Sequence, residues 1–392
     1  MQHTHLALHL PEILSHIFSF LVPNHTPEDS KQKLYTHLFS CLFVNHTWHH
    51  YATKIIWRDV CFEDKQYEFD TFLKFAATLK EKSAMSVFEA LSITDNLPSC
   101  SSSTSTCSSF DITTPDCDPE MECTKITHPD HLKNQLELSA NRIYRQHHYS
   151  HSLRSLTLRK IKLKSLNKPL TRIGQSASQL AHLDIYICDH IDAKVLQPFF
   201  YHQSLSYLSL AGCHLIADAS VLQVAQHCPR LEHLDLRACG QVTDISIAAI
   251  AQGCPRLKHL NVGRVRDREK ITVASIGLIA KHTKASVLGL AGCEVNDECM
   301  ELLASYRGSG LERISVNSCS NISNATIYAF INHCPNLSVF EMKECPLVDD
   351  WEAVAELVQR KVLLTLCNVQ SKAFNEWARV NGKLLDLRAP LK

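Results

Sequence analysis

The stretch LEHLDLRAC, residues 231–239, decides the fold, because its pattern L-x-x-L-x-L-x-x-C returns about every 26 residues along the chain. Close copies begin at Leu180, Leu205, Leu311 and Leu337, and degraded copies begin at Leu153, Leu257 and Ala285. Eight copies at a nearly constant spacing indicate a solenoid, in which each repeat packs mainly on its neighbours.

Each repeat predicts a short strand followed by a helix. The L-x-L part alternates with period two, so its leucines point inward from a strand. Apolar residues at helical spacing come next, as in Val221, Val224 and Ala225, and a Cys-Pro pair such as Cys228-Pro229 ends the helix. An acidic or amide residue precedes each helix and is predicted to be its N-cap, because it can accept a bond from a free backbone N–H. These residues are Asp218, Asp244, Asp297, Asn324 and Asp350.

These repeats resemble the cysteine-containing class of leucine-rich repeat over residues 150–370, and the QVTD step at 241–244 is typical of that class. The resemblance implies a right-handed α/β solenoid, with parallel strands on the concave face and helices on the convex face. The repeat array is also loosely similar to the antagonist-of-mitotic-exit-network proteins of fungi, which implies a cell-cycle role.

Residues 6–62 contain three helical patterns with more apolar positions than so short a segment can bury by itself. The segment resembles an F-box, which implies a three-helix unit that binds the adaptor subunit of a ligase. The residues that the resemblance assigns to adaptor binding are Leu10, Pro11, Ile13, Leu14, Ile17, Phe18, Leu21, Val44, Trp48, Ile56 and Trp57. The alternative is that these helices only cover the open end of the solenoid.

Residues 63–95 are interpreted as a linker with a possible divergent first repeat at 88–95. Residues 96–134 are rich in Ser, Thr and Cys and poor in large apolar side chains, so we expect disorder there. The cysteines and histidines of this insertion do not form the close pairs that zinc sites use, so no metal site is predicted. Phosphorylation of its serines is the more plausible role. The zinc candidates are Cys100, Cys107, Cys117, Cys123, His128 and His131.

The end of the chain predicts a last truncated strand within VLLTLCNVQ, residues 362–370, and then a capping tail at 371–392. In this tail Phe374, Trp377 and Val380 share one helical face, which suits a cap over the last repeat. A partner-binding helix is the alternative interpretation.

The repeats place polar residues in columns along the concave face, and we expect this array to contact a protein substrate. Its residues are His182, Asp184, Tyr186, Tyr207, His233, Asp235, Arg237, His259, Asn261, Arg313 and Asn317. For any single residue of this array, exposure to water is the simpler explanation of why it is polar. The longer loop GRVRDREK at 263–270 could bind an acidic or phosphorylated segment through Arg264, Arg266, Arg268 and Lys270, although a solvated loop is more ordinary.

Composition limits the function classes. Forty basic and forty acidic residues cancel, so no general affinity for nucleic acid or anionic membranes is expected. No apolar run of about 20 residues predicts a membrane span. Of the seventeen cysteines, most of those after residue 180 are explained by the repeat, which favours reduced, buried thiols and a cytoplasmic or nuclear location.

No catalytic or cofactor-binding motif is found, so we expect neither an enzyme nor a cofactor. The combined resemblances imply a substrate-recognition subunit of an SCF-type cullin–RING ubiquitin ligase, which binds the adaptor and, through it, the cullin–RING scaffold. The alternatives are a leucine-rich-repeat scaffold or inhibitor that recruits no ligase, and a metal-dependent or redox protein.

Overall fold

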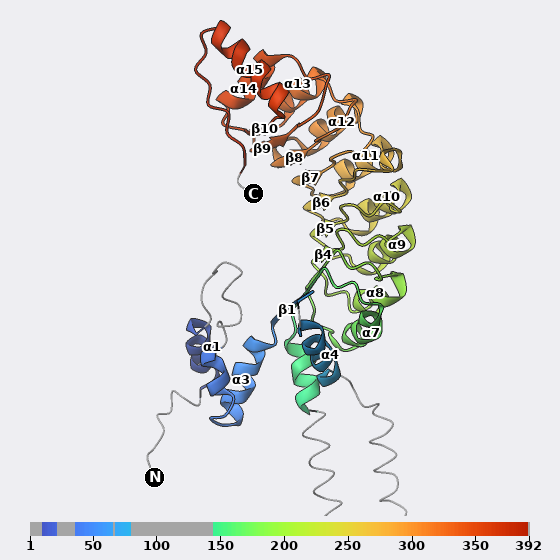
Figure 1. Ribbon diagram of the computed structural model, residues 1–392, viewed down its shortest axis with the longest axis vertical. Coiled ribbons are helices and arrows are strands. Elements are labelled where there is room, and N and C mark those ends of the chain that lie inside the picture. The colour runs from blue at the N-terminus through green and yellow to red at the C-terminus, as the bar shows by residue number, and fades with distance from the viewer. Residues whose placement is uncertain (1–9, 22–35, 66, 80–143, 391–392) are drawn as a thin grey trace, which may run out of the picture. The chain divides into compact units, whose positions relative to one another are not determined.

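A computed structural model describes residues 10–21, 36–65, 67–79 and 144–390. Within them, ten strands form one parallel sheet whose spatial order is the order in the chain (Figure 1). This arrangement confirms the predicted α/β solenoid. The strands are β1 (Asp59–Glu63), β2 (Ser155–Arg159), β3 (His182–Tyr186), β4 (Tyr207–Ser209), β5 (His233–Asp235), β6 (His259–Asn261), β7 (Val287–Gly289), β8 (Arg313–Ser315), β9 (Val339–Glu341) and β10 (Leu363–Thr365).

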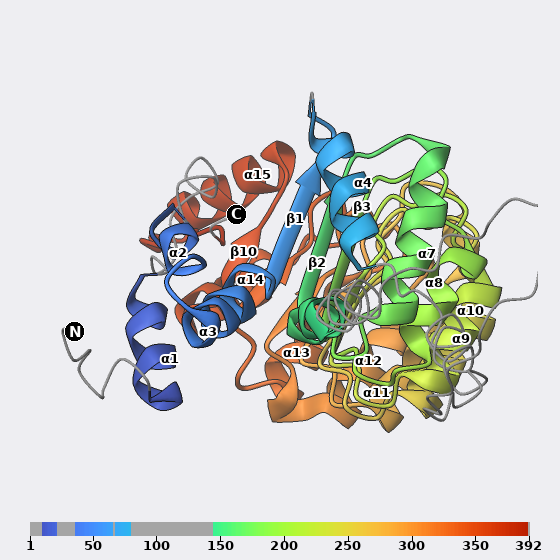
Figure 2. The same cartoon turned by 90° about the horizontal axis from the view of Figure 1, so that it is seen from below.

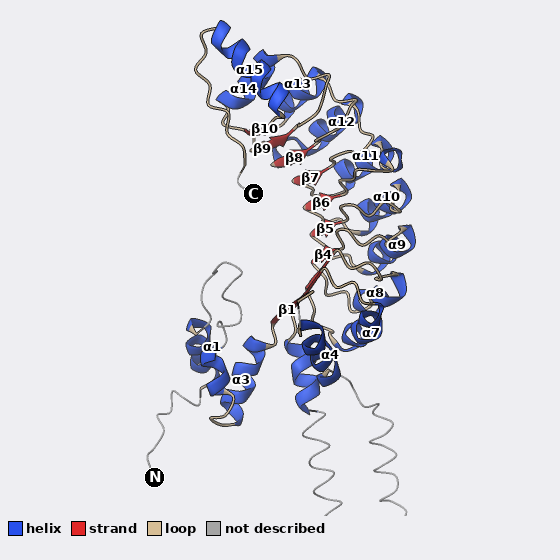
Figure 3. Ribbon diagram, in the orientation of Figure 1, coloured by secondary structure: helices blue, strands red, loops and turns tan. Residues whose placement is uncertain are grey.

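A helix follows each strand of the sheet. Figure 3 shows β4 to β9 on the inner side of the curve and the helices that alternate with them on its outer side. These helices are α4 (Glu68–Thr78), α7 (Asn167–Ser176), α8 (Ala193–Phe200), α9 (Asp218–His227), α10 (Asp244–Gly253), α11 (Val273–His282), α12 (Asp297–Arg307), α13 (Asn324–His333), α14 (Trp351–Gln359) and α15 (Asn368–Val380).

The core of the solenoid lies between the sheet and the helices. The central apolar residue of each repeat is buried and stands in register with its neighbours, as Leu183, Leu208 and Leu234 do. The predicted apolar triplets of the helices are buried as well. The repeat cysteines fill the layer after each strand, where their thiols lie near carbonyls of the preceding repeat. Cys239 Sγ, for example, is 3.2 Å from Leu210 O.

The prediction of the helix caps was wrong by one residue in most repeats. Asp218, Asp244 and Asp297 are the first helical residues, and the cap positions belong to Ala217, Thr243 and Asn296. Asn324 likewise follows its cap, Ser323, whereas Asp350 caps α14 as predicted. The displaced carboxylates bind the next repeat instead: Asp218 accepts from the N–H and hydroxyl of Thr243.

The sheet begins earlier than the repeat pattern indicated. Strand β1 begins inside the segment 6–62 that was assigned to helices and ends at Glu63, and it pairs with β2 across the long insertion. Figure 2 shows β1 and β2 side by side, with α4 next to them. The pattern concealed this repeat because DVCFE lacks leucine and the partner strand is more than 90 residues away. The possible first repeat at 88–95 lies outside the described residues.

The other end of the sheet is covered by α15 and the chain after it. Phe374 is fully buried against the last repeats and Trp377 packs beside it, as predicted. Val380 is 71% exposed, so its predicted place on this face was wrong, because it is the last residue of the helix. The tail then returns to β10, where Leu364 N–H donates to Arg388 O at 2.9 Å. The predicted last strand is therefore confirmed as β10.

Candidate protein-interaction surfaces

The first candidate surface is the column of side chains that opens β3, β4, β5 and β6. The parallel register aligns His182, Tyr207, His233 and His259. Their rings form a continuous stack, with centroids 3.8 Å apart between His182 and Tyr207, 4.0 Å between Tyr207 and His233, and 3.9 Å between His233 and His259. The sequence predicted the column, and the structure brings its rings into contact.

Burial in the stack shifts the ionisation of these rings. Burial, together with a smaller effect of the neighbouring His259, lowers the pKa of His233 to about 4. Burial also lowers the pKa values of His182 and His259, against the opposing effect of nearby carboxylates. It raises the pKa of the Tyr207 phenol. At neutral pH the stack is therefore a row of uncharged rings.

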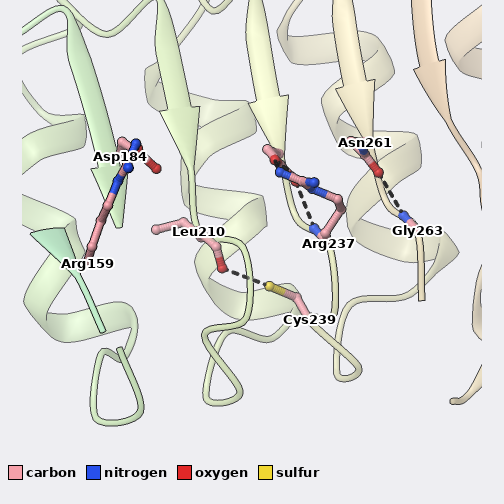
Figure 4. Close-up of polar contacts among 8 residues, drawn as sticks. Arg159, Asp184, Leu210, Arg237, Cys239, Asn261 and Gly263 are labelled. Atoms are coloured by element: carbon pink, nitrogen blue, oxygen red, sulfur yellow. Dashed lines mark hydrogen bonds and ion pairs between the residues drawn. The ribbon is translucent and has the colours of Figure 1, made fainter. Parts of the chain in front are cut away.

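Charged residues at the positions that follow the rings along the strands pair with each other. Asp235 is buried and accepts from the Arg237 guanidinium, with Nη2–Oδ2 at 2.6 Å and Nε–Oδ2 at 2.9 Å. Arg159 of β2 approaches Asp184 of β3, with Nη2–Oδ2 at 3.8 Å. Figure 4 shows the Arg159 side chain reaching Asp184, and Arg237 two strands further along the sheet. Tyr186 is half-buried in the same register as Arg159.

From β6 to β9, beyond the ring stack, the concave positions hold amide side chains and one ion pair. Asn261 Oδ1 accepts from Gly263 N–H at 3.1 Å, and the same side chain fills the space that a Cβ on Gly289 would occupy. Arg313 forms an ion pair with Glu341, and Asn317 Nδ2 donates to Glu341 Oε2 at 3.2 Å. Sequence reasoning missed Arg159 and Glu341. Arg159 is aligned with Tyr186 and Glu341 with Ser315, so extending the aligned positions by one repeat at each end of the array would have included both.

The loop at residues 263–270 is not the free basic surface that the sequence suggested. Arg264 is only 5% exposed, and its Nη1 donates to the carbonyls of Val242 and Asp267. Arg268 donates to Ser318 O and Lys270 donates to Gly240 O. The two extra residues of this repeat move the left-handed turn residue to Asp267, and Arg264 then enters the interior. Most of the basic groups therefore hold the loop to its neighbours.

The second candidate surface belongs to a separate small core formed by α1 (Pro11–Phe20), α2 (Thr36–Cys41) and α3 (His46–Ile56). Leu14 and Phe18 of α1 are fully buried there, and the Phe18 ring meets Trp48 edge-on at 5.2 Å. Leu21 and Ile56 pack against the same core.

Burial therefore corrects part of the predicted adaptor set. Leu14 and Phe18 face the core and are not at the surface. Trp57 belongs to the core of the solenoid, where it stacks on Tyr149 at 4.5 Å and on Phe75 at 5.1 Å. The apolar character of Leu14, Phe18 and Trp57 does not distinguish a side chain that packs in a core from one that faces a partner.

Next to this core, the helices also present exposed apolar side chains. Leu10, Ile13 and Ile17 lie on one face of α1 at helical spacing, beside the exposed Pro11. Val44 is also exposed, and Phe43 beside it is 87% exposed. The prediction missed Phe43 and two further exposed side chains, Phe20 and Phe39. We call Leu10, Ile13, Ile17, Phe20, Phe39, Phe43 and Val44 the outer apolar residues.

Fungal proteins match this chain. Relatives named "Antagonist of mitotic exit network protein 1" include one from Eremothecium gossypii that is 35% identical over 209 residues, which cover 52% of this chain and 52% of the relative. The protein of that name from Candida glabrata is 30% identical over 190 residues, 47% of this chain and 36% of the relative. The chain therefore spans about half, or less, of the length of these relatives. No protein-family model matches it.

Among solved structures, the crystal structure of the Rad7 and Elc1 complex in yeast is similar to this chain, with a TM-score of 0.47 and 18% sequence identity. The match covers 60% of this chain and 58% of that one.

The remaining predictions concern cysteines, metals and membranes. In the described ranges most cysteines are buried, as predicted, and Cys61 and Cys367 are partly buried. The same ranges contain no cluster of three or more His, Cys, Asp or Glu residues that could hold a metal ion. They also contain no helix of the length and hydropathy needed to cross a bilayer. The proposed zinc ligands of the insertion lie outside the described residues.

Proposed function

We propose that this protein is the substrate-recognition subunit of an SCF-type cullin–RING ubiquitin ligase. In this proposal α1 to α3 form an F-box that binds the adaptor subunit, and the concave face of the sheet holds a protein substrate. The chain carries out no bond chemistry. It raises the local concentration of a substrate lysine near the ubiquitin-loaded enzyme, in the cytoplasm or the nucleus.

The observation that carries the proposal is that the apolar stripe of α1 is wider than the part that its own core covers. Its inner side, with Leu14 and Phe18, is covered by α2 and α3. Its outer side presents Leu10, Ile13 and Ile17, and Glu12 is its only acidic residue. A surface helix normally packs its apolar stripe against other residues. The outer side therefore calls for a partner, and the F-box resemblance of the same residues favours the adaptor.

The concave face suits the second task. Its rings, carboxylates and amides are held in a fixed array by the strands and by their own contacts, and such rigid columns are suited to recognition. Placing the two tasks on two different surfaces allows the adaptor and the substrate to bind at the same time.

The test is co-expression with the adaptor subunit, followed by size-exclusion chromatography. We expect the wild type to co-elute with the adaptor at equal stoichiometry. The variant Ile13→Asp/Ile17→Asp should elute alone with its repeats folded, because two charges would be desolvated at the interface. Leu215→Asp is the matched control, since Leu215 is an exposed leucine of the repeats. A wild type that elutes alone and folded would contradict the proposal.

The second candidate function is a leucine-rich-repeat scaffold or inhibitor that recruits no ligase. The name of the relatives favours it, because an antagonist can act by occupying its target without destroying it. Under this alternative α1 to α3 cover part of the chain itself, and the adaptor does not bind.

A further inference from the structure

Most charged side chains in the concave columns form ion pairs with one another. Three of the arginines in its columns already engage a carboxylate of a neighbouring position: Arg159 with Asp184, Arg237 with Asp235, and Arg313 with Glu341. Lys343, in the column of Arg237, is exposed and is the exception. Phosphate groups are recognised by clusters of free arginines. A phosphate brought to the centre of this face would meet arginines that are already bound, together with the carboxylates that bind them.

The ring stack has polar atoms that the rest of the chain does not use. In the described part of the chain, the ring nitrogens of His182, His233 and His259 and the Tyr207 hydroxyl make no hydrogen bond. An uncharged imidazole offers one N–H donor and one nitrogen acceptor, and a phenol can both donate and accept. Burial keeps the imidazoles uncharged at neutral pH.

Stacking also determines which part of each ring a partner can reach. The flat faces of Tyr207 and His233 are covered on both sides by the neighbouring rings. A partner can therefore meet these two rings only at their edges, where the polar atoms are. The ring edges form a row across the four adjacent strands β3 to β6. The row runs perpendicular to the strands.

We infer that this row reads the uncharged hydrogen-bonding groups of an unphosphorylated protein segment that lies across β3 to β6. Its contacts are the partner's backbone amides and its Asn, Gln, Ser or Thr side chains. The inference deepens the proposed function by naming the kind of substrate, and it rests on that proposal only in using the concave face for recognition. It does not depend on the adaptor.

The test uses a phage-displayed library of random 15-residue peptides, selected on the full-length protein at pH 7.5. Enriched peptides are synthesised without phosphate and with phosphate on each Ser or Thr, and their affinities are measured by fluorescence polarisation in 50 and 300 mM NaCl. Two variants, Tyr207→Phe and His233→Phe, keep an aromatic ring in the stack and remove its polar edge. Ile245→Ser, at an exposed position of the outer helix α10, is the control.

We expect enriched peptides rich in uncharged polar residues, with affinities that are insensitive to salt and not improved by phosphate. Each edge variant should weaken binding by about 3- to 10-fold, which corresponds to the loss of one hydrogen bond, and the control should not. Selection of acidic peptides, tighter binding of the phosphorylated forms, unchanged affinity in both edge variants, or no enrichment would each overturn the inference. Adaptor co-elution is measured separately, so failure of ligase recruitment is distinguishable from failure of this row.

Discussion

The carboxylate of Asp218 accepts hydrogen bonds from the backbone N–H of Thr243 at 2.8 Å and from its hydroxyl at 2.7 Å, one repeat further along the chain. Asp244 binds Thr272 in the same way, and Asp297 binds Ser323. The donating residue is the N-cap of the next helix in each case. These carboxylates therefore join the start of one helix to the start of the next and set the spacing of the repeats.

This ladder predicts that Asp218→Asn destabilises the solenoid. Burial alone would raise the pKa of Asp218, but hydrogen bonds from Ser246 and Thr243 outweigh that effect and hold the pKa below its ordinary value. Hydrogen bonds to a charged group contribute about 1.5 to 3 kcal/mol, so we expect a loss of that order in the free energy of unfolding in urea. The control is Asp386→Asn, which removes only an exposed ion pair with Arg388. Equal unfolding curves for the two variants would refute the role of the ladder.

The ring stack predicts that stability falls on mild acidification. The folded-state pKa of His233 is about 4, below its ordinary value of 6.5. The unfolded chain therefore binds more protons between these values, and stability is lost as the pH falls through this window. His259, His182, Asp235 and Arg237 are the titratable and charged groups that act on this ring.

The measurement is the urea midpoint at pH 7.5 and at pH 5.0. We expect His233→Phe to lose less stability between these values than the wild type, because the variant has no imidazole to protonate at this position. The pKa values of Asp218 and Asp297 in the ladder are lowered by their hydrogen bonds, so these carboxylates stay charged in this range. A variant as acid-sensitive as the wild type would argue against the neutral stack.

Thiol reactivity should differ sharply among the repeat cysteines. Burial raises the pKa values of Cys228, Cys239 and Cys254 to about 12, so their thiolates are scarce and also inaccessible. Cys367 lies at the start of α15, where the Gln370 backbone lowers its pKa, and it is only partly buried. In a timed iodoacetamide reaction followed by mass spectrometry, Cys367 should be alkylated long before the other three. Simultaneous labelling in the native protein would show that the repeats open readily.

The two sides of α1 should respond differently to truncation. Leu14→Ala removes a fully buried side chain and should destabilise the α1–α3 core by about 2 to 5 kcal/mol. Ile13→Ala, one residue earlier, changes an exposed side chain and should cost about 0.5 kcal/mol or less. Limited proteolysis within residues 10–56 compares them: only Leu14→Ala should speed cleavage. Faster cleavage of both would mean that Ile13 is already covered within the chain.

Sequence reasoning predicted the features that repeat and missed those that occur once. Leu183 and its equivalents recur at a constant spacing, so period alone predicted the strands, their register and the concave columns. Strand β1 has no leucine pattern, and only its pairing with a strand far away in the sequence identifies it. Arg264 looked like an exposed cation because a two-residue insertion, invisible in composition, turns it inward. Helical spacing predicted the apolar positions of α1 but not which of them face the core.

The most direct test of the central claim is hydrogen–deuterium exchange of the whole protein, alone and with saturating adaptor subunit. The account predicts that the adaptor slows amide exchange in residues 10–20 and 36–44, which carry the outer apolar residues, and leaves exchange in β3 to β6 unchanged. Unchanged exchange in both helical segments, or protection confined to the concave strands, would contradict the assignment of adaptor binding to this surface.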